Sequence, residues 1–337
     1  MSGVGLGAGS WITGATTGYL AESLVGFLDA SQVALSIDNG SRTLTVTPTG
    51  TEFTIYVQGV KHVLTAAQSV TWTNATGLHY FYFDATGTLT HTTTFTVELL
   101  TKYTFASVLY WDAASSSRVY WGDERHGIYM GTYTHIYLHS TRGAQWDRGL
   151  GLIGFSVDGD GSAAAHAQFT AASGVIWDED IKFLIPAQAQ IPVLFKSGST
   201  WKKKAADAFP VIYSGTAGYT GTRLPYNLNT AGTWSLAEVS ANKFVLVHVF
   251  GTNDIDNPVV AVQGIAEYNS KSAARTGADT ELQTLSDLPF AEFTPLGCVI
   301  FETSSAYTNA VKARIVSTDT GANYVDKRAT YFRPDTL

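Results

Sequence analysis

The chain has 337 residues, which exceeds the size of one ordinary hydrophobic core and predicts two or three domains. Charged residues make up 15% and aromatic residues 12%, a balance that favours strands joined by polar turns over a charge-rich helical enzyme. The net charge is −7 and no basic face is apparent, so nucleic acid is excluded as an expected partner.

The first segment, residues 1–30, is rich in glycine, which disfavours helix and strand alike. We interpret it as a docking arm that orders against a neighbouring protein, with a frayed terminus as the alternative. The first basic residue is Arg42, so we expect no signal peptide and synthesis in a cytoplasm. No stretch runs apolar for about 18 residues, so we expect no membrane insertion.

Residues 31–124 alternate between apolar and polar side chains, which is typical of half-buried strands. The predicted strands are 42–47, 53–57, 60–64, 70–73, 79–84, 104–111 and 118–121. Short turns such as Gln58-Gly59 separate them, as in β-hairpins. This spacing indicates an antiparallel β-sandwich or small barrel.

Residues 125–150 interrupt this pattern. Between Arg125 and His139 the apolar residues recur at helical spacing. We expect this helix to end near Gly143. These apolar residues are Ile128, Tyr129, Tyr133, Ile136 and Tyr137. The pattern predicts a helical connector between two β regions.

Residues 151–337 predict a second β region, with a division into 151–205 and 206–337 as an open alternative. The predicted strands are 181–185, 193–196, 201–203, 243–250, 259–262, 293–301 and 311–316. The expected fold class is therefore mainly β, with tandem antiparallel β-sandwich or barrel-like modules and one short helical connector.

The two β regions contain similar runs. Phe105–Trp111 is followed by a polar turn and a basic strand, and so is Pro295–Phe301. An aromatic strand precedes each run, at 79–84 and 244–250. We infer a duplicated module, about 31–124 and 155–335, which requires the two halves to share a strand order.

His135 and His139 are the candidate metal ligands, because residues four apart share one face of a helix. Ile136 stands where a zinc protease of the HExxH type needs glutamate. A continuous helix would place His126 about 13 Å from His135, too far to share an ion. We therefore expect no metal or cofactor, and histidines that face a neighbouring domain or subunit.

Other chemistry-bearing residues have structural interpretations. Asp158–Gly161 begins like a calcium loop but lacks the later acidic ligands, so we interpret it as a tight turn. Paired acids at 123–124 and 178–180 would support glycoside hydrolysis only if they faced each other. Cys298 lies in an apolar run and is interpreted as a small hydrophobic side chain. We expect no enzymatic activity.

Exposed aromatic side chains could instead stack on sugar rings. The candidate glycan contacts are Trp72, Trp201, Tyr219 and Trp234. The alternative for each is burial in the core or in a subunit interface.

Several segments resemble virion structural proteins of tailed bacteriophages, namely tail, baseplate or tail-fibre components. They are 121–127, 135–144, 288–290, 293–296 and 307–313, and the resemblance runs from about residue 36 to the end. It implies a β-rich, cofactor-free module of the virion that assembles as a homo-oligomer, commonly a trimer or a multiple of three. The glycine-rich arm would dock to other virion proteins.

Two alternative functions remain open, and both concern attachment to the host. One is a tail protein that binds a host-surface glycan or receptor, and the other is a glycan-degrading tail enzyme.

Overall fold

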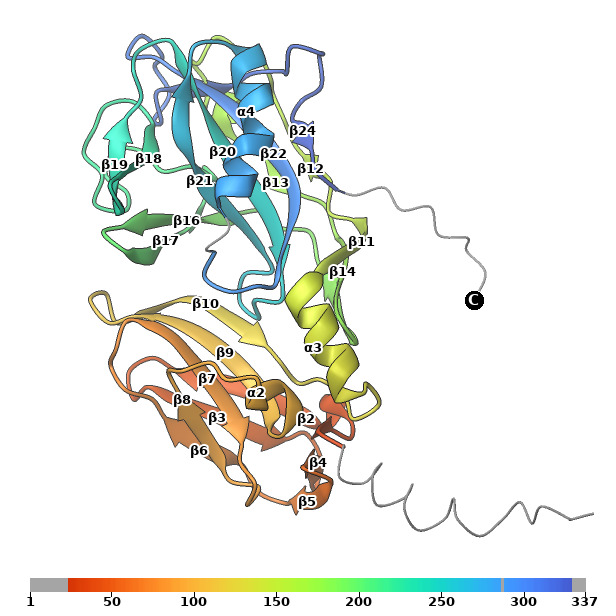
Figure 1. The fold of residues 1–337 in the computed structure, drawn as a ribbon. Coiled ribbons are helices and arrows are strands. Elements are labelled where there is room, and N and C mark those ends of the chain that lie inside the picture. Colours follow the sequence, from red (N-terminus) through yellow and green to blue (C-terminus); the bar gives the residue numbers. More distant parts are fainter. Residues whose placement is uncertain (1–23, 286–287, 329–337) are drawn as a thin grey trace, which may run out of the picture. The chain divides into compact units, whose positions relative to one another are not determined.

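The computed structural model describes residues 24–285 and 288–328, which form two compact units (Figure 1). Within these residues, unit 1 contains 24–74, 78–108 and 123–141, and unit 2 contains 75–77, 109–122 and the rest from 142 onward. Most of the predicted docking arm, residues 1–23, lies outside the described residues. The protein is mainly β, as predicted, and its sheets do not close into barrels.

Unit 1 holds three sheets, with strand orders β1-β4-β5, β2-β3-β6 and β10-β9-β7-β8. Strands β9 and β10 run across the division, because residues 109–122 are counted with unit 2. The elements are β1 (Gly26–Phe27), η1 (Ala30–Gln32), β2 (Val33–Asp38), β3 (Thr43–Pro48), β4 (Phe53–Val57), β5 (Val60–Leu64), β6 (Gln68–Thr71), β7 (Gly77–Phe83), β8 (Leu89–Thr92), α2 (Glu98–Thr101), β9 (Thr104–Asp112), β10 (Ser117–Asp123) and α3 (Thr132–Thr141).

Aromatic side chains form much of the core of unit 1. Phe83 packs edge-on against Phe27 and Phe53, with ring centroids 6.2 and 6.1 Å apart. All three are fully buried, and burying one such ring stabilises the fold by about 1.5–3 kcal/mol. These contacts join β1, β4 and β7 into one core.

Unit 2 is built on one large sheet of order β17-β16-β21-β20-β22-β23, with β24 also paired to β22. Strands β16 and β21 are parallel, with Val193 opposite Ala261, and the other pairs are antiparallel. The elements are β11 (Gln145–Gly149), β12 (Leu152–Ile153), η2 (Ala164–Ala167), β13 (Thr170–Ala171), β14 (Gly174–Asp178), β15 (Ile181–Ile185), β16 (Ile191–Ser197), β17 (Thr200–Asp207), β18 (Pro225–Thr230), β19 (Thr233–Glu238), β20 (Lys243–Thr252), β21 (Val259–Tyr268), α4 (Lys271–Thr284), β22 (Phe293–Thr303), β23 (Ala313–Ile315) and β24 (Val325–Asp326).

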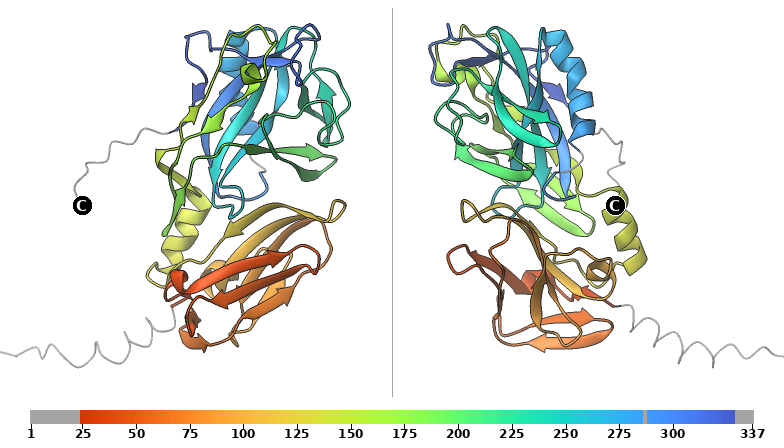
Figure 2. Two further views of the ribbon diagram at one scale, coloured as in Figure 1. Left: turned by 180° about the vertical axis from the view of Figure 1, so that it is seen from behind. Right: turned by 60° about the vertical axis from the view of Figure 1, so that its left-hand side comes forward.

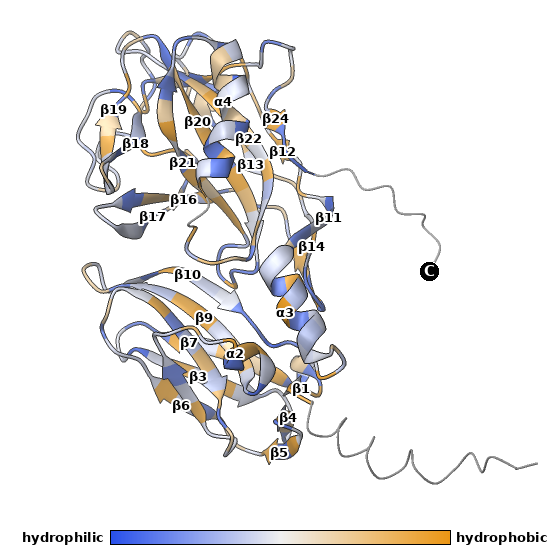
Figure 3. Cartoon of the chain, in the orientation of Figure 1, coloured by the Kyte–Doolittle hydropathy of each residue, from blue (hydrophilic) through white to orange (hydrophobic). Residues whose placement is uncertain are grey.

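Strand β20 is buried on both faces of this sheet. Val245, Val247 and Val249 join the large core on one face, whereas Leu246 packs with Ala274 and Ala278 of α4 on the other. Figures 1 and 2 show α4 lying along this second face, and Figure 3 shows how apolar β20, β21 and β22 are. The alternation places the side chain of His248 on the α4 side.

The helices differ from the sequence prediction in two ways. Helix α3 begins at Thr132 rather than at Arg125, and it is grouped with unit 1 instead of standing apart as a connector. Helix α4 was not predicted, because its sequence has few large apolar residues. Ser270 caps its start by accepting the Ala273 N–H at 3.1 Å.

Two of the sheets share a strand order over four strands. The order β8-β7-β9-β10 in one sheet corresponds to β21-β20-β22-β23 in the other, with α2 or α4 inserted at the same step of the chain. The inferred duplication required a shared order, so this agreement supports it.

Candidate functional site

The chain bends before α3 and brings His126 beside His135. The backbone of residues 126–128 is paired with β1: Phe27 N–H donates to the His126 carbonyl at 2.9 Å, and Ile128 N–H donates to the Phe27 carbonyl at 3.1 Å. Because this segment is held by β1 and not wound into the helix, the His126 and His135 ring centroids lie 4.4 Å apart. The prediction that His126 lies too far from His135 is therefore wrong.

A carboxylate completes this group in unit 1. Glu124 Oε2 lies 3.6 Å from His126 Nε2, and the His139 ring centroid is 6.0 Å from that of His135. Glu124, His126 and His135 are 0%, 4% and 8% exposed, and His139 is half-buried. We call Glu124, His126, His135 and His139 the histidine cluster.

The opposite face of the same segment carries tyrosines. Tyr129, Tyr133 and Tyr137, spaced four residues apart, are 85%, 82% and 59% exposed. The usual amphipathic arrangement is thus reversed, with a histidine facing inward and aromatic rings facing solvent. The sequence pattern identified the helical spacing but not which face is buried. We call these three residues the tyrosine row.

Unit 2 contains a second histidine group, beneath α4. His248 Nδ1 lies 3.0 Å from Cys298 Sγ, and His248 Nε2 lies 2.8 Å from Glu281 Oε2. Glu281 also accepts the Ile265 N–H at 2.9 Å and the Tyr268 hydroxyl at 2.7 Å. The β20–β22 register places His248 opposite Cys298, and α4 supplies Glu281. We call His248, Cys298, Glu281 and Tyr268 the buried network.

The buried network favours a charged imidazole. Burial by itself lowers the pKa of His248, but the Cys298 sulfur and the Glu281 carboxylate outweigh it and raise that pKa to about 10. Burial and the Glu281 charge raise the pKa of Tyr268, so this hydroxyl stays a proton donor. At neutral pH the group therefore holds an imidazolium between a sulfur and a carboxylate.

A cysteine, a histidine and a carboxylate in a row resemble the order of groups in thiol hydrolases. His248 and Cys298 are 0% exposed and Glu281 is 2% exposed, so a substrate has no path to the sulfur in this conformation. Gly264 makes room for the carboxylate, because a Cβ there would meet the Leu246 carbonyl at 2.3 Å and Glu281 Oε2 at 3.0 Å. The arrangement is suited to holding α4 on the sheet. Sequence reasoning identified Cys298 as buried but missed its partners.

Three of the four candidate glycan contacts are core residues. Trp72, Trp201 and Tyr219 are 3%, 4% and 6% exposed, so the prediction that they form a surface stacking platform is corrected. Trp234 is half-buried, and Lys196 Nζ lies 5.2 and 5.3 Å from the Trp201 and Trp234 ring centroids. This cation stacks between the two rings, which fixes them as packing elements.

The remaining sequence candidates make polar contacts with other side chains. Asp158 accepts the Ser317 hydroxyl at 2.5 Å and pairs with Lys271 at 3.5 Å, as a turn residue would. Asp123 pairs with Arg125 at 2.6 Å. Asp178 is fully buried and accepts the Asn253 amide at 2.6 Å.

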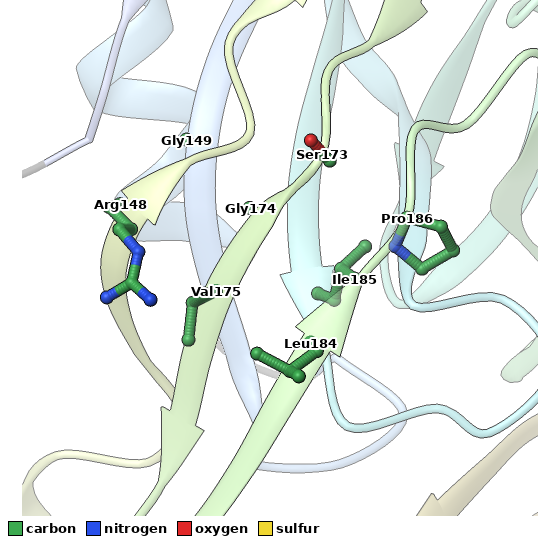
Figure 4. Close-up of a pocket in the computed structure, with 8 residues that line it drawn as sticks. All are labelled: Arg148, Gly149, Ser173, Gly174, Val175, Leu184, Ile185 and Pro186. Atoms are coloured by element: carbon green, nitrogen blue, oxygen red, sulfur yellow. The ribbon is translucent and has the colours of Figure 1, made fainter.

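Two of the hollows on the surface of unit 2 bear on ligand binding. One, of about 660 Å³, is wide and shallow and involves Leu184, which is 71% exposed (Figure 4). Its lining residues are Arg148, Gly149, Ser173, Gly174, Val175, Leu184, Ile185 and Pro186. The other, of about 380 Å³, is more polar and is lined by Phe195, Ser197, Ala217–Gly221, Ser235, Leu236 and Glu238. Tyr219 lines the second hollow, whereas the other three candidate glycan contacts line neither of the two.

No family model, curated protein or solved structure matches this chain. Among the described residues, no helix has the length and apolar character needed to span a membrane.

Proposed function

We propose that the protein is a non-enzymatic structural subunit of a tailed-phage virion, in the tail, baseplate or tail fibre, which assembles with copies of itself as a trimer or a multiple of three. The observation that carries the proposal is the tyrosine row, three large aromatic side chains open to solvent on one segment. Tyrosine is enriched in protein interfaces, because its ring buries a large area at low entropic cost. Contiguous exposed apolar surface of this kind marks interaction sites.

Two further features support assembly. Only 15% of the residues are charged, so a large part of the surface can be desolvated at small electrostatic cost. The His248, Cys298 and Glu281 side chains of the buried network are enclosed beneath α4, so they hold the fold together and are closed to a substrate. Open antiparallel sheets also expose strand edges, which subunit contacts cover.

Light scattering of the purified full chain tests the self-assembly. We expect a mass that is a multiple of three chains, which falls to that of one chain when Tyr133 and Tyr137 are both replaced by Ser. The matched control replaces both by Phe, which keeps the aromatic area and should keep the oligomer. A wild-type mass of one chain at all concentrations would contradict the proposal, and immunogold imaging of intact particles tests the location in the virion.

The polar hollow around Tyr219 favours a second candidate, a host-surface glycan receptor protein. Ser197, Thr220, Ser235 and Glu238 offer exposed hydroxyl and carboxylate groups around this hollow, which can hydrogen-bond to sugar hydroxyls. Glycan-array binding that is abolished by Ser235→Arg, a change at an exposed rim residue, would favour this candidate. A blank array for the wild-type chain would remove it, and release of sugar from host polysaccharide would instead indicate a glycan-degrading enzyme.

A further inference from the structure

We propose that residues 329–337 of this chain dock in the shallow hollow around Leu184 of unit 2, with the aromatic pair Tyr331 and Phe332 as the anchor. We call residues 329–337, which follow the last described residue, the tail segment. The inference goes beyond the proposed function and does not rest on it, because every contact that supports it lies within unit 2.

The hollow offers an open apolar surface on the sheet β11-β14-β15. Val175 of the middle strand lies opposite Arg148 on one side and opposite Leu184 on the other, so the three side chains share one face (Figure 4). Val175 is 4% exposed, whereas Leu184 is more exposed, at 71%, than any other leucine, isoleucine or valine that the structure describes. A segment that covers Leu184 removes apolar surface from water, which is favourable in proportion to the area.

The chain is fixed at the edge of this hollow just before the tail segment begins. The Lys327 N–H donates to the Leu296 carbonyl at 3.1 Å. The Arg328 guanidinium donates to the Gly149 carbonyl at 2.9 Å and lies over the Trp146 ring, 5.7 Å from its centroid. Gly149 is itself one of the residues that line the hollow. The tail segment therefore leaves the fold from a residue that already contacts the hollow.

The length of chain beyond Arg328 matches the distance that has to be covered. Neighbouring strands lie about 4.7–4.9 Å apart, so Leu184 on β15 is roughly 10 Å from β11, across the middle strand. An extended chain advances by about 3.3–3.6 Å per residue, so Tyr331 and Phe332 reach roughly 10–14 Å from Arg328. The two aromatic rings are thus the part of the tail segment that reaches Leu184.

The chemistry of the tail segment and its attachment favour it over an occupant from another molecule. Tyr331 and Phe332 are adjacent, and an aromatic ring is the side chain that covers most apolar area in a wide, shallow hollow. A short tether holds them near the hollow at an effective concentration in the millimolar range. A second copy of the chain would have to bring the same rings without that advantage.

Limited digestion of the full chain with chymotrypsin, which cuts after aromatic residues, tests the docking. Cleavage tracks the population of the undocked form, so we expect cuts after Tyr331 and Phe332 to be about 10-fold slower in the wild type than in Leu184→Asp. Mass spectrometry of the released peptides measures the rates. The matched control is Ile153→Asp, because Ile153 is 49% exposed in the same unit but does not line the hollow. Equal rates for wild type and Leu184→Asp, or equal acceleration by Ile153→Asp, would overturn the proposal.

Disulfide trapping shows which chain supplies the tail segment. The double variant Leu184→Cys with Phe332→Cys should form a bond within one chain under mild oxidation, and the native Cys298 is fully buried and stays apart from it. The control pair, Ile153→Cys with Phe332→Cys, should react at least about 10-fold more slowly, because a docked ring is held near Leu184 at a raised effective concentration. A bond between two chains would place another copy's tail segment in the hollow, and equal rates for the two pairs would mean that nothing docks there. Either result contradicts the proposal.

Discussion

The two histidine groups use the same kinds of side chain in different ways. In the buried network of unit 2, both His248 nitrogens lie within hydrogen-bonding distance of a partner, Cys298 at 3.0 Å and Glu281 at 2.8 Å. In the histidine cluster of unit 1, the His126 and His135 rings contact each other and Glu124 Oε2 lies 3.6 Å from His126 Nε2. The comparison teaches that the same residue types can be joined by side-chain hydrogen bonds across paired strands in one unit and by ring contacts in the other.

The largest effect is expected from Glu281→Ala. The change leaves the His248 imidazolium and the Tyr268 hydroxyl buried without their acceptor, which costs about 3–5 kcal/mol of unfolding free energy. Urea unfolding followed by tryptophan fluorescence measures it. Glu281→Gln keeps an acceptor oxygen and should cost less; equal losses for both variants would show that shape rather than charge holds α4.

The buried network should also make stability depend on pH. The pKa of His248 is raised from 6.5 to about 10 on folding, so its contribution is fully present below about pH 6.5 and is lost as the pH rises toward 10. The slope is at most about 1.4 kcal/mol per pH unit. Urea unfolding of wild type and of His248→Gln between pH 7 and pH 9 measures it. Parallel slopes for the two proteins would remove His248 as the cause.

The smallest effect on stability is expected in the tyrosine row. Because Tyr133 is 82% exposed, Tyr133→Ser should change the unfolding free energy of the dissociated chain by no more than about 0.5 kcal/mol. Thermal melts at a concentration where the wild type is a single chain provide the test. A larger loss would mean that this ring packs within its own subunit.

Local sequence pattern predicted most of the strands. Phe53–Val57, Val60–Leu64 and Ile181–Ile185 match β4, β5 and β15 residue for residue, because alternation and turn chemistry are local signals. Helix α4 could have been anticipated only from Ser270 as a cap, since its buried face consists of Ala274, Ala278 and Glu281.

The sites depend on long-range pairing, and the sequence alone could not reveal them. His248 meets Cys298 because β20 and β22 pair in one register, fifty positions apart in the chain. His126 meets His135 because β1 holds residues 126–128 out of the helix. The helical spacing of the apolar residues predicted a helix that starts at Arg125 and runs through Gly127 and Gly131. In the structure α3 begins only at Thr132, after both glycines.

The parallel pairing of β16 with β21 constrains the order of folding. Val193 lies opposite Ala261, and the hairpins β16–β17, β18–β19 and β20–β21 lie wholly or partly between these partners in the chain. Hairpins can close early because their loops are short, whereas this pair must wait for a loop of roughly 70 residues. During synthesis on the ribosome, the edge of β16 therefore stays open until residues beyond 261 emerge. That interval is when the nascent chain is most exposed to pairing with the wrong strand.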